Sequence, residues 1–407
     1  MRFSHTADCH VGGHRDPRLR QLTETAFARF IDESIQANVD FIIIAGDLFN
    51  TAIPGIDTLK FVVTQLGKPK AKNIPVYAIP GSHDYSPSGK TMLDVLEEAG
   101  LLRNVCRGTV TDDGKLKLSF TTDQRTGVKL TGVIGKRGML DRHIYEELDR
   151  SIEREPGKKV FLFHTSISEL KPQHLQEMES YPVSFLPKGF DYYAGGHVHI
   201  VERYAQSGYG NVVYPGPLFP NSFSELERLR HGGYYIYDDT AAGAPSLTRR
   251  EIALKEVISI KVNVEGMESH DADRALHAAA DGVHAKGAIV LLRIEGTLRS
   301  GSPNDINVRD TVSGLEQRGA YIVLRNTARL TSQEFASMQV KADEPHRIEE
   351  TLLAEHADQL AIPGGDGAAL ARELLKLLAR EQHEGENANE YHDRMVKDAL
   401  GILDQKP

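Results

Sequence analysis

The amino-acid sequence predicts a layered α/β or α+β domain, followed by a small α+β module and a helical C-terminal region. Three observations support this prediction. Short apolar runs alternate with amphipathic helices up to about residue 252, a second alternation begins after Lys255, and charged helical patterns dominate from about residue 340. With 407 residues the chain exceeds the roughly 250 to 300 that one core usually holds, so two or three domains are expected.

The predicted strands of the first region are short apolar runs. A helix is expected over residues 19–36, because Leu22, Ala26 and Phe30 lie at helical spacing. A shorter helix is expected over residues 91–99, ending at Gly100. The runs are RFSHTA, DFIIIA, PVYAIP, VKLTGVI, KVFLFH, DYYAGG and VVYPG.

The second region reads as strand, helix, strand, helix and strand. The expected ranges are 257–264, 271–284, 288–295, 310–318 and 320–324. We therefore predict three parts: residues 1–252, a small α+β cap over residues 253–335, and a helical region over residues 336–407.

Two apolar stripes at helical spacing mark the last region. Short amphipathic helices of this kind either pack back on their own domain or dock on a partner. The stripes are Leu370, Leu374, Leu377 and Leu378, then Tyr391, Met395, Ala399, Ile402 and Leu403, with the polar connector 384–389 between them.

The composition is that of an ordinary globular protein, with 40% hydrophobic and 26% charged residues. The sequence contains no run of roughly 18 apolar residues, the length that a helix needs to cross a bilayer, so no membrane association is expected. Cys9 and Cys106 cannot form a disulfide framework in so long a chain, which favours a reducing, cytoplasmic location.

The formal net charge of -9 argues against a surface that attracts nucleic acid everywhere. A local basic groove is compatible with it. Candidate pieces of such a groove are Lys136 and Arg137 with Arg142 and His143, the segment 229–231, and Arg249 with Arg250. Each of these pieces alone also fits ordinary solvated surface charge.

Polar side chains follow five of the apolar runs at the point where each run ends. These carboxylates and imidazoles lie at the ends of the predicted strands, where layered α/β proteins have their binding sites. The residues are Asp8 and His10, Asp47, the segment Ser82, His83 and Asp84, then His164, and finally His197 and His199.

The spacing within these groups predicts a shared site. In an extended chain, residues two positions apart, such as Asp8 and His10, point to the same side. Cys9 between them is expected to face the core. Gly46, Gly81, Gly195 and Gly196 are expected to allow sharp turns and close approach to an ion.

Imidazole and carboxylate ligands without a cysteine framework suit Mn²⁺, Fe²⁺ or Zn²⁺. Seven candidate ligands exceed what one tetrahedral ion uses. A pair of ions about 3.5 to 4 Å apart, bridged by one carboxylate, accommodates them and serves in-line displacement at phosphorus. Asp47 is the natural bridge, because it lies between the two ligand sets in sequence.

The ordered motifs of these strand ends resemble those of the calcineurin-like metallophosphoesterases. The details are most similar to the nuclease subunits of bacterial SbcCD complexes and of their archaeal and eukaryotic relatives in double-strand-break repair. AGDLFN, IPVYAIPGSHD, YYAGGHVH and VVYPGPL carry this similarity, which covers roughly residues 1–240 well and the remainder only in layout. The resemblance implies a two-sheet sandwich flanked by helices, a small cap and a helical tail.

The resemblance also implies roles for individual residues. One metal ion would be held by Asp8, His10, Asp47 and His199, and the other by Asp47, Ser82, His164 and His197. His83 would face the scissile phosphate, and Asp84 would orient the site or cap its turn. The expected ions are two Mn²⁺, with Fe²⁺ or Zn²⁺ as alternatives. Asn50, Lys136 and Arg137 are the candidate substrate-binding residues.

Two positions depart from the family pattern. Ser82 stands where most members have Asn, and a seryl hydroxyl is a shorter neutral ligand. Asn50 stands where close relatives have a His after the GDLF motif, and an amide cannot shuttle a proton at neutral pH.

The function predicted by this resemblance is a Mn²⁺-dependent DNA exonuclease or endonuclease. It would work as a homodimer in double-strand-break repair, and its C-terminal helices would bind an SbcC-type coiled-coil ABC ATPase. The alternatives are a phosphodiesterase for small or cyclic molecules and an assembly subunit with a weakened site. A phosphate-binding loop ending in Ser86 to Thr91 is disfavoured, because Asp84 occupies the position of its first glycine. No G-x-S-x-G elbow of a serine hydrolase occurs.

Overall fold

The computed structural model describes residues 1–86, 89–136, 141–175, 177–241, 243–333, 367–380 and 388–404. The chain divides into two compact units, Met1–Leu330 and Thr331–Pro407. The first unit includes both the layered region and most of the segment that the sequence suggests as a separate cap. The division at residue 252 therefore stays a prediction.

The first sheet has six strands, and four of them run parallel to one another. At one edge, β13 pairs antiparallel with β1, and β14 pairs antiparallel with β13. In sheet order the strands are β14 (Ser246–Ile252), β13 (Gly232–Asp238), β1 (Arg2–Thr6), β2 (Phe41–Ala45), β3 (Val76–Ile79) and β4 (Arg103–Asn104). Every residue of β2 is buried, as expected for a parallel strand covered on both faces.

The second sheet also has six strands, with β8, β9, β10 and β12 parallel. In sheet order they are β11 (Val201–Gln206), β12 (Tyr209–Pro215), β10 (Tyr192–Gly196), β9 (Lys159–His164), β8 (Lys129–Gly132) and β7 (Thr121–Thr122). Phe3 and Phe41 of the first sheet pack with Val160, Leu162 and Tyr192 of the second in one buried cluster. The predicted two-sheet sandwich is confirmed.

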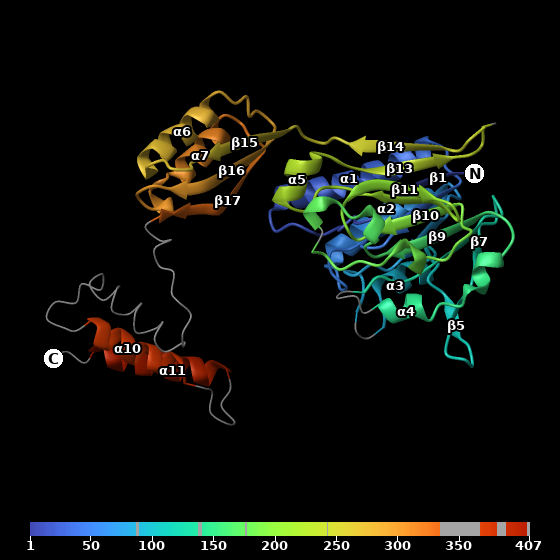
Figure 1. Cartoon of the computed structure of the whole chain (residues 1–407), viewed down its shortest axis with the longest axis horizontal. Helices are drawn as coiled ribbons and strands as arrows, with labels where there is room; N and C mark the ends of the chain where they lie inside the picture. Colours follow the sequence, from blue (N-terminus) through green and yellow to red (C-terminus); the bar gives the residue numbers. More distant parts are fainter. Residues whose placement is uncertain are drawn as a thin grey trace. The chain divides into compact units, whose positions relative to one another are not determined.

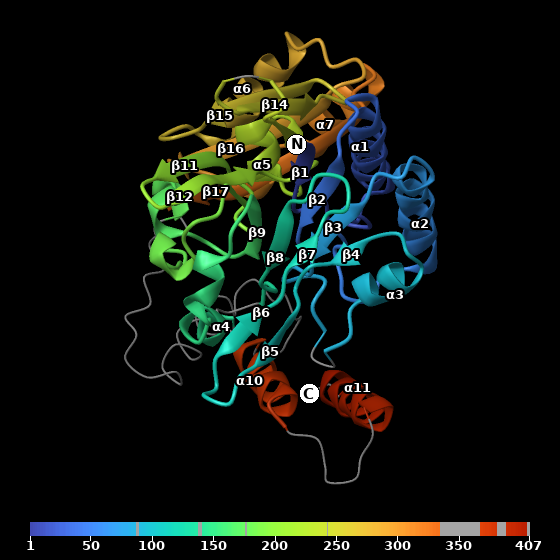
Figure 2. The ribbon, with the colours of Figure 1, turned by 90° about the vertical axis from the view of Figure 1, so that its right-hand side faces the viewer.

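Three helices cover the outer face of the first sheet (Figure 2). They are α1 (Pro17–Gln36), α2 (Ile56–Ala71) and α3 (Met92–Glu98). The start of α1 follows from local chemistry, because Asp16 accepts a hydrogen bond from the main chain of Arg18 and Pro17 occupies the first turn. Phe27 and Phe30 then lie on its buried face.

Short segments cover the outer face of the second sheet, whose core includes Phe161, Phe163 and Tyr193. They are α4 (Arg142–Glu146) and the 3-10 turns η2 (Arg150–Arg154), η3 (Ser168–Leu170), η4 (Gln173–Leu175) and η5 (Val183–Phe185). A small hairpin joins β5 (Gly108–Val110) to β6 (Leu116–Leu118). One further helix, α5 (Phe223–Leu229), lies between β12 and β13 in the chain.

The third sheet belongs to the module predicted after Lys255. Its strands are β15 (Val257–Asn263), β16 (Ile289–Leu298) and β17 (Ile322–Ser332), and its helices are α6 (Ser269–Asp281) and α7 (Val308–Gln317), with the turn η6 (Pro303–Asp305). Both helices lie on one face of the sheet (Figure 1). Val257, Ile289 and Leu291 also join the core cluster of α1 and α2. The expected order of strands and helices is present.

The second unit contains α10 (Gly367–Leu378) and α11 (Ala388–Asp404), which contact each other. Leu377 and Met395, one from each predicted apolar stripe, are buried. Part of the predicted connector, residues 384–387, lies outside the described residues. Within the described part of the chain, no helix is long and apolar enough to span a membrane.

Candidate metal centre

The loops that follow β1 and β2 are held together by main-chain hydrogen bonds. Asp8 N donates to Gly46 O (3.1 Å), and His10 N donates to Asp47 O (3.0 Å). The main-chain N–H of His197, just after β10, donates to the Asp8 carboxylate (2.9 Å). Because β1 and β2 belong to one sheet and β10 to the other, these bonds draw the strand ends of both sheets to one place.

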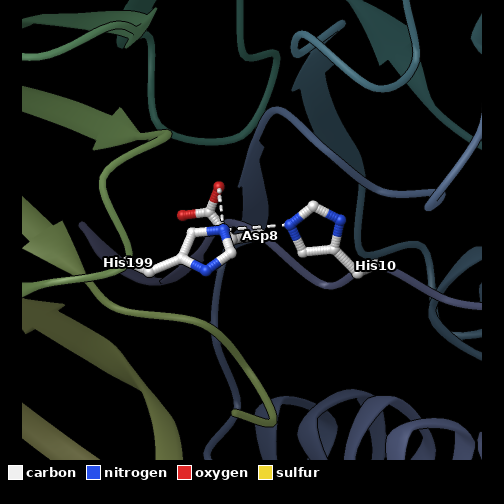
Figure 3. Close-up of side chains that lie close together, drawn as sticks. All are labelled: Asp8, His10 and His199. Atoms are coloured by element: carbon white, nitrogen blue, oxygen red, sulfur yellow. Dashed lines mark hydrogen bonds and ion pairs between the residues drawn. The ribbon is translucent and has the colours of Figure 1, made fainter. Parts of the chain in front are cut away.

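Asp8, His10 and His199 form the first group of candidate ligands (Figure 3). The Nε2 atoms of His10 and His199 lie 3.0 Å apart. Nε2 of His199 lies 3.6 Å from Oδ1 of Asp8. Three ligand atoms within 4.8 Å of one another could contact a single ion.

Asp8, Asp47 and His164 form a second group. Nε2 of His164 lies 3.2 Å from Oδ2 of Asp47 and 3.9 Å from Oδ1 of Asp8. Its Nδ1 donates to the carbonyl of Ala45 (2.9 Å), so Nε2 is the atom left to bind an ion. This Nε2 is buried and has no hydrogen-bond partner in the described structure. A buried nitrogen of this kind, aimed at two carboxylates, fits a divalent cation.

Asp47 belongs to two of the groups, because it also clusters with His10 and His83. Its Oδ2 lies 3.8 Å from Nε2 of His10. The carboxylate of Asp47 therefore lies between His10, after β1, and His164, at the end of β9. This position suits the bridging role predicted for Asp47.

The main chain is strained at these ligands. Left-handed φ angles occur at Asp8 (51°), His10 (43°), Asp47 (52°), His197 (97°) and His199 (49°). The expectation that extended chain aims Asp8 and His10 to one side is wrong, since β1 ends at Thr6. The turns after the strand aim both side chains instead, while Cys9 is buried in the core.

Glycines make room for the ligands themselves. A Cβ at Gly46, whose φ is 89°, would collide with the ring of His164, and a Cβ at Gly81 would collide with the Asp47 carboxylate. A Cβ at Gly196 would collide with the carbonyl of Ala45 and with the ring of His164. Gly195 instead approaches the ring of Phe163 in the core, so its expected role next to an ion is wrong.

Ser82 and His197 complete the predicted second ligand set. Ser82 is buried, and its Oγ lies 3.5 Å from Oδ2 of Asp47. The ring of His197 lies 5.2 Å from that of His164, measured between centroids. Within the described residues, His197 falls in none of the three close groups.

His83 is half-buried beside this cluster, and its ring lies 4.8 Å from that of His10. Its main-chain N–H donates to Oδ1 of Asp47 (2.7 Å), and its Nδ1 lies 2.7 Å from the carbonyl of Asn50. Nδ1 is therefore the donor, and Nε2 is left for other contacts. Asn50 thus contacts His83 through its main chain.

Asp84 is buried and contacts only the main chain in the hydrogen bonds described. Its carboxylate accepts from the N–H groups of Leu48 (3.1 Å), Phe49 (2.9 Å) and Gly81 (3.0 Å). Burial, followed by the charge of Asp47, raises the pKa of Asp84 to about 7. These bonds join the loop after β2 to the loop after β3.

Of the two predicted basic substrate-binding residues, Lys136 and Arg137, the structure describes only Lys136. The ammonium group of Lys136 lies 5.5 Å from the centroid of the Tyr85 ring, within range of a cation–π contact. Arg137 lies outside the described residues.

The electrostatics of the cluster also fit a bound cation. Burial lowers the pKa of His164, but the Asp47 carboxylate outweighs it and raises that pKa to about 10. Asp8 and Glu225 likewise raise the pKa of His199 to about 9 against the effect of burial. Without a bound ion, two protonated imidazoles would thus supply positive charge beside the carboxylates, and a divalent ion that binds there would displace the protons from Nε2.

The other two histidines stay neutral, because burial lowers the pKa of both His10 and His197 to about 3. Neutral imidazole is the form that binds metals. Burial would raise the pKa of Asp47, but the charge of His164 holds it well below its usual range. Asp47 is therefore an ionised carboxylate.

A cavity of about 390 Å³ opens next to the ligands. One part of its wall is polar and includes the predicted ligands, and another part is apolar. The lining residues are Asp47, Ser82, His83, His197, His199, Ser222, Ser224, Glu225 and Arg228, with Leu175, Met178 and Val198.

Sequence reasoning did not identify Glu225 or Arg228. Oε1 of Glu225 lies 3.0 Å from Nδ1 of His199, and Arg228 donates to the carbonyl of His199 (3.0 Å). The S-x-x-E pattern from Ser222 to Glu225, a helix-start signal, was available to find α5.

Comparison with known proteins agrees with this geometry. Residues 1–201 match the family model of the calcineurin-like phosphoesterases. Three similar relatives are each named DNA double-strand break repair protein Mre11. The protein of Archaeoglobus fulgidus is 26% identical over 291 residues, 66% of this chain and 63% of the relative. Those of Methanococcus maripaludis and Methanopyrus kandleri are 33% and 28% identical, covering 58% and 65% of this chain and 62% and 60% of the relatives.

The matches thus span less than two thirds of the length of these relatives. The family match, over residues 1–201, includes every strand end that carries a predicted ligand, from Asp8 to His199. Residues 1–201 therefore form a calcineurin-like phosphoesterase domain.

Proposed function

We propose that this protein is a Mn²⁺-dependent DNA nuclease, acting as an exonuclease or endonuclease in double-strand-break repair. The observation that carries the proposal is the convergence of Asp8, Asp47 and His164 from both sheets, with the buried Nε2 of His164 unpartnered. The names of the relatives support the choice of DNA over other phosphodiesters.

Two ligand sets fit this cluster. Asp8, His10, Asp47 and His199 would hold one ion, and Asp47, Ser82, His164 and His197 the other. Bound divalent ions would polarise the phosphate and lower the pKa of a bound water. His164 presents Nε2 to this site because Ala45 accepts the hydrogen of its Nδ1.

His83 would contact the scissile phosphate or the leaving oxygen. Because its Nδ1 donates to Asn50, only Nε2 faces the reaction, and the ring must carry both protons to act as an acid there. Asp84 would hold the two loops in place, and Lys136, Arg137 and Asn50 would line the path of the DNA.

The second unit would bind the coiled coil of an ABC-type ATPase. Several large apolar side chains on α10 and α11 are 43% to 64% exposed, which is typical of a docking surface. They are Leu375, Leu378, Val396, Leu400 and Leu403. A homodimer is also proposed, from the same family resemblance.

His83→Ala tests the chemical role. We expect both ions to remain bound while Mn²⁺-dependent hydrolysis of DNA and of bis-p-nitrophenyl phosphate falls by about 10²- to 10⁴-fold. The measurements are metal content and kcat, and exposed His270→Ala is the control. Unchanged turnover would reject the role of His83.

The same assays separate the alternatives. Two bound ions without turnover in the unaltered protein would favour an assembly subunit. Hydrolysis of small diesters but not of single- or double-stranded DNA would favour a small-molecule phosphodiesterase. The absence of any metal binding under Mn²⁺ saturation would overturn the proposal itself.

A further inference from the structure

Glu225 lies outside the predicted ligand sets and contacts a histidine within them. Its Oε1 lies 3.0 Å from Nδ1 of His199, and both side chains are less than one fifth exposed. An ionised carboxylate only accepts hydrogen bonds, so Nδ1 of His199 is the donor. Nε2, the atom left to bind an ion, then faces Asp8 and His10, at 3.6 Å and 3.0 Å.

The other histidines of the site differ in what fixes their rings. Main-chain carbonyls accept from Nδ1 of His164 and of His83. Nδ1 of His10 is buried and has no partner in the described structure. Of these four rings, only that of His199 has a carboxylate as the acceptor at Nδ1. A carboxylate acceptor orients a metal-binding imidazole and increases its basicity as a ligand.

The start of helix α5 places this carboxylate. Oγ of Ser222 accepts from the main-chain N–H of Glu225 (3.2 Å), and Oε2 of Glu225 accepts from that of Asn221 (2.8 Å). One carboxylate oxygen therefore accepts from the main chain just before the helix, and the other contacts His199. Arg228, one turn later, donates to the carbonyl of His199 (3.0 Å).

Helix α5 is also fixed to the third sheet. Arg293 of β16 makes two hydrogen bonds to the carboxylate of Glu227, at 2.9 and 2.7 Å, and its guanidinium group lies 5.1 Å from the centroid of the Phe223 ring. Paired bonds of this kind are among the strongest between side chains. The helix is thus a rigid support for a residue whose main chain is left-handed.

We propose that Glu225 is the positioning residue for His199, and that it strengthens binding of the ion held by Asp8, His10 and His199. This inference rests on the two-ion site proposed above. Without Glu225, the His199 ring is free to carry its proton on Nε2, which removes the lone pair that the ion needs.

The test uses full-length Glu225→Ala and Glu225→Gln, with Glu98→Ala as the matched control. Glu98→Ala is the same chemical change at an exposed position at the end of α3, outside the candidate site. Calorimetric Mn²⁺ titration should show about 10- to 100-fold weaker binding at one of two sites for Glu225→Ala, and an intermediate loss for Glu225→Gln. Glu98→Ala should leave both affinities within twofold.

A second readout does not depend on metal. In chelator-treated protein at a pH above about 9, where the His199 ring carries one proton, ¹⁵N NMR should show that proton on Nδ1, and Glu225→Ala should shift it toward Nε2. A folded Glu225→Ala with unchanged tautomer and Mn²⁺ affinity would overturn the inference. If the unaltered protein binds no Mn²⁺, the proposed function fails, and the NMR result still decides whether Glu225 orients His199.

Discussion

Strained residues gather at the candidate metal centre. Among the described residues, nine other than glycine have a left-handed φ, and five of these are Asp8, His10, Asp47, His197 and His199. Each such conformation costs on the order of 1–3 kcal/mol and persists only when its surroundings fix it. Here the fixing contacts are the hydrogen bonds between neighbouring loops, so the site's geometry is maintained at the expense of local stability.

Ser82 is the ligand position where a single residue should tune metal binding. An asparagine reaches further than a serine and offers an amide oxygen to the second ion. Ser82→Asn should strengthen binding of that ion by about tenfold, or ~1.4 kcal/mol, in a Mn²⁺ titration. Ser82→Ala is the control and should not tighten it. An unaltered titration for Ser82→Asn would contradict the assignment.

Asp238 provides a prediction about pH. Its carboxylate accepts from Thr240 and from two nitrogens of Arg2, and these bonds hold its pKa at about 2. Since the pKa is lower in the folded state, Asp238 stabilises the protein above about pH 4, and this contribution is lost as the pH falls through about 2.

Asp238→Asn should therefore lower the free energy of unfolding at pH 7 by about 1 kcal/mol or less, because the pair lies near the surface. The difference from the unaltered protein should shrink between about pH 4 and pH 2. Urea unfolding at several pH values measures it, with Asp112→Asn in the β5–β6 turn as control. A difference that grows toward low pH would refute the prediction.

At the scale of elements, the parts that sequence patterns missed have clear physical reasons. Helix α2 contains Gly67 and Pro69, which are both helix-breaking signals, yet Val62 and Leu66 are buried in the core and packing overrides local preference. Helix α5 has seven residues, too few for a periodic pattern. Its contacts with His199 make it part of the site.

Two glycine substitutions separate helix preference from site geometry. Gly67→Ala should stabilise the protein by about 0.5–1 kcal/mol, because a Cβ there meets nothing within 4 Å and alanine favours a helix. Gly46→Ala, the same chemical change, should weaken Mn²⁺ binding because its Cβ collides with His164. Thermal unfolding and metal titration of both variants test this, and equal behaviour of the two would contradict it.

At the scale of the whole molecule, the chain separates into two compact units. The first unit has its own core, and the third sheet shares part of it through Val257, Ile289 and Leu291. In the second unit, Leu377 and Met395 are buried while other apolar side chains of α10 and α11 remain exposed. Chemistry and partner binding are therefore expected to be separable.

Ending the chain after residue 335 should keep Mn²⁺ binding and hydrolysis of a small diester, because the proposed ligands all lie before residue 200. It should abolish capture of a coiled-coil ABC ATPase in a binding assay. Leu378→Asp with Leu400→Asp, at side chains 64% and 54% exposed, should do the same in the full chain. Capture by the shortened chain would contradict the proposed role of the second unit.

The sequence by itself determined the strand ends and the residue types placed there. Five apolar runs followed by carboxylates and imidazoles predict a site where parallel strands terminate, and Asp8, Asp47 and His164 do converge. That information is local, because an apolar strand and the polar residues that follow it are consecutive in the sequence.

Only the tertiary structure decided how the ligands are aimed and supported. The left-handed turns at Asp8 and His10, the acceptors that fix His164 and His83, and the contact of Glu225 with His199 all depend on residues distant in the chain. Hydrogen bonds between loops of different strands set these orientations, and no periodic pattern along the chain records which loops will meet.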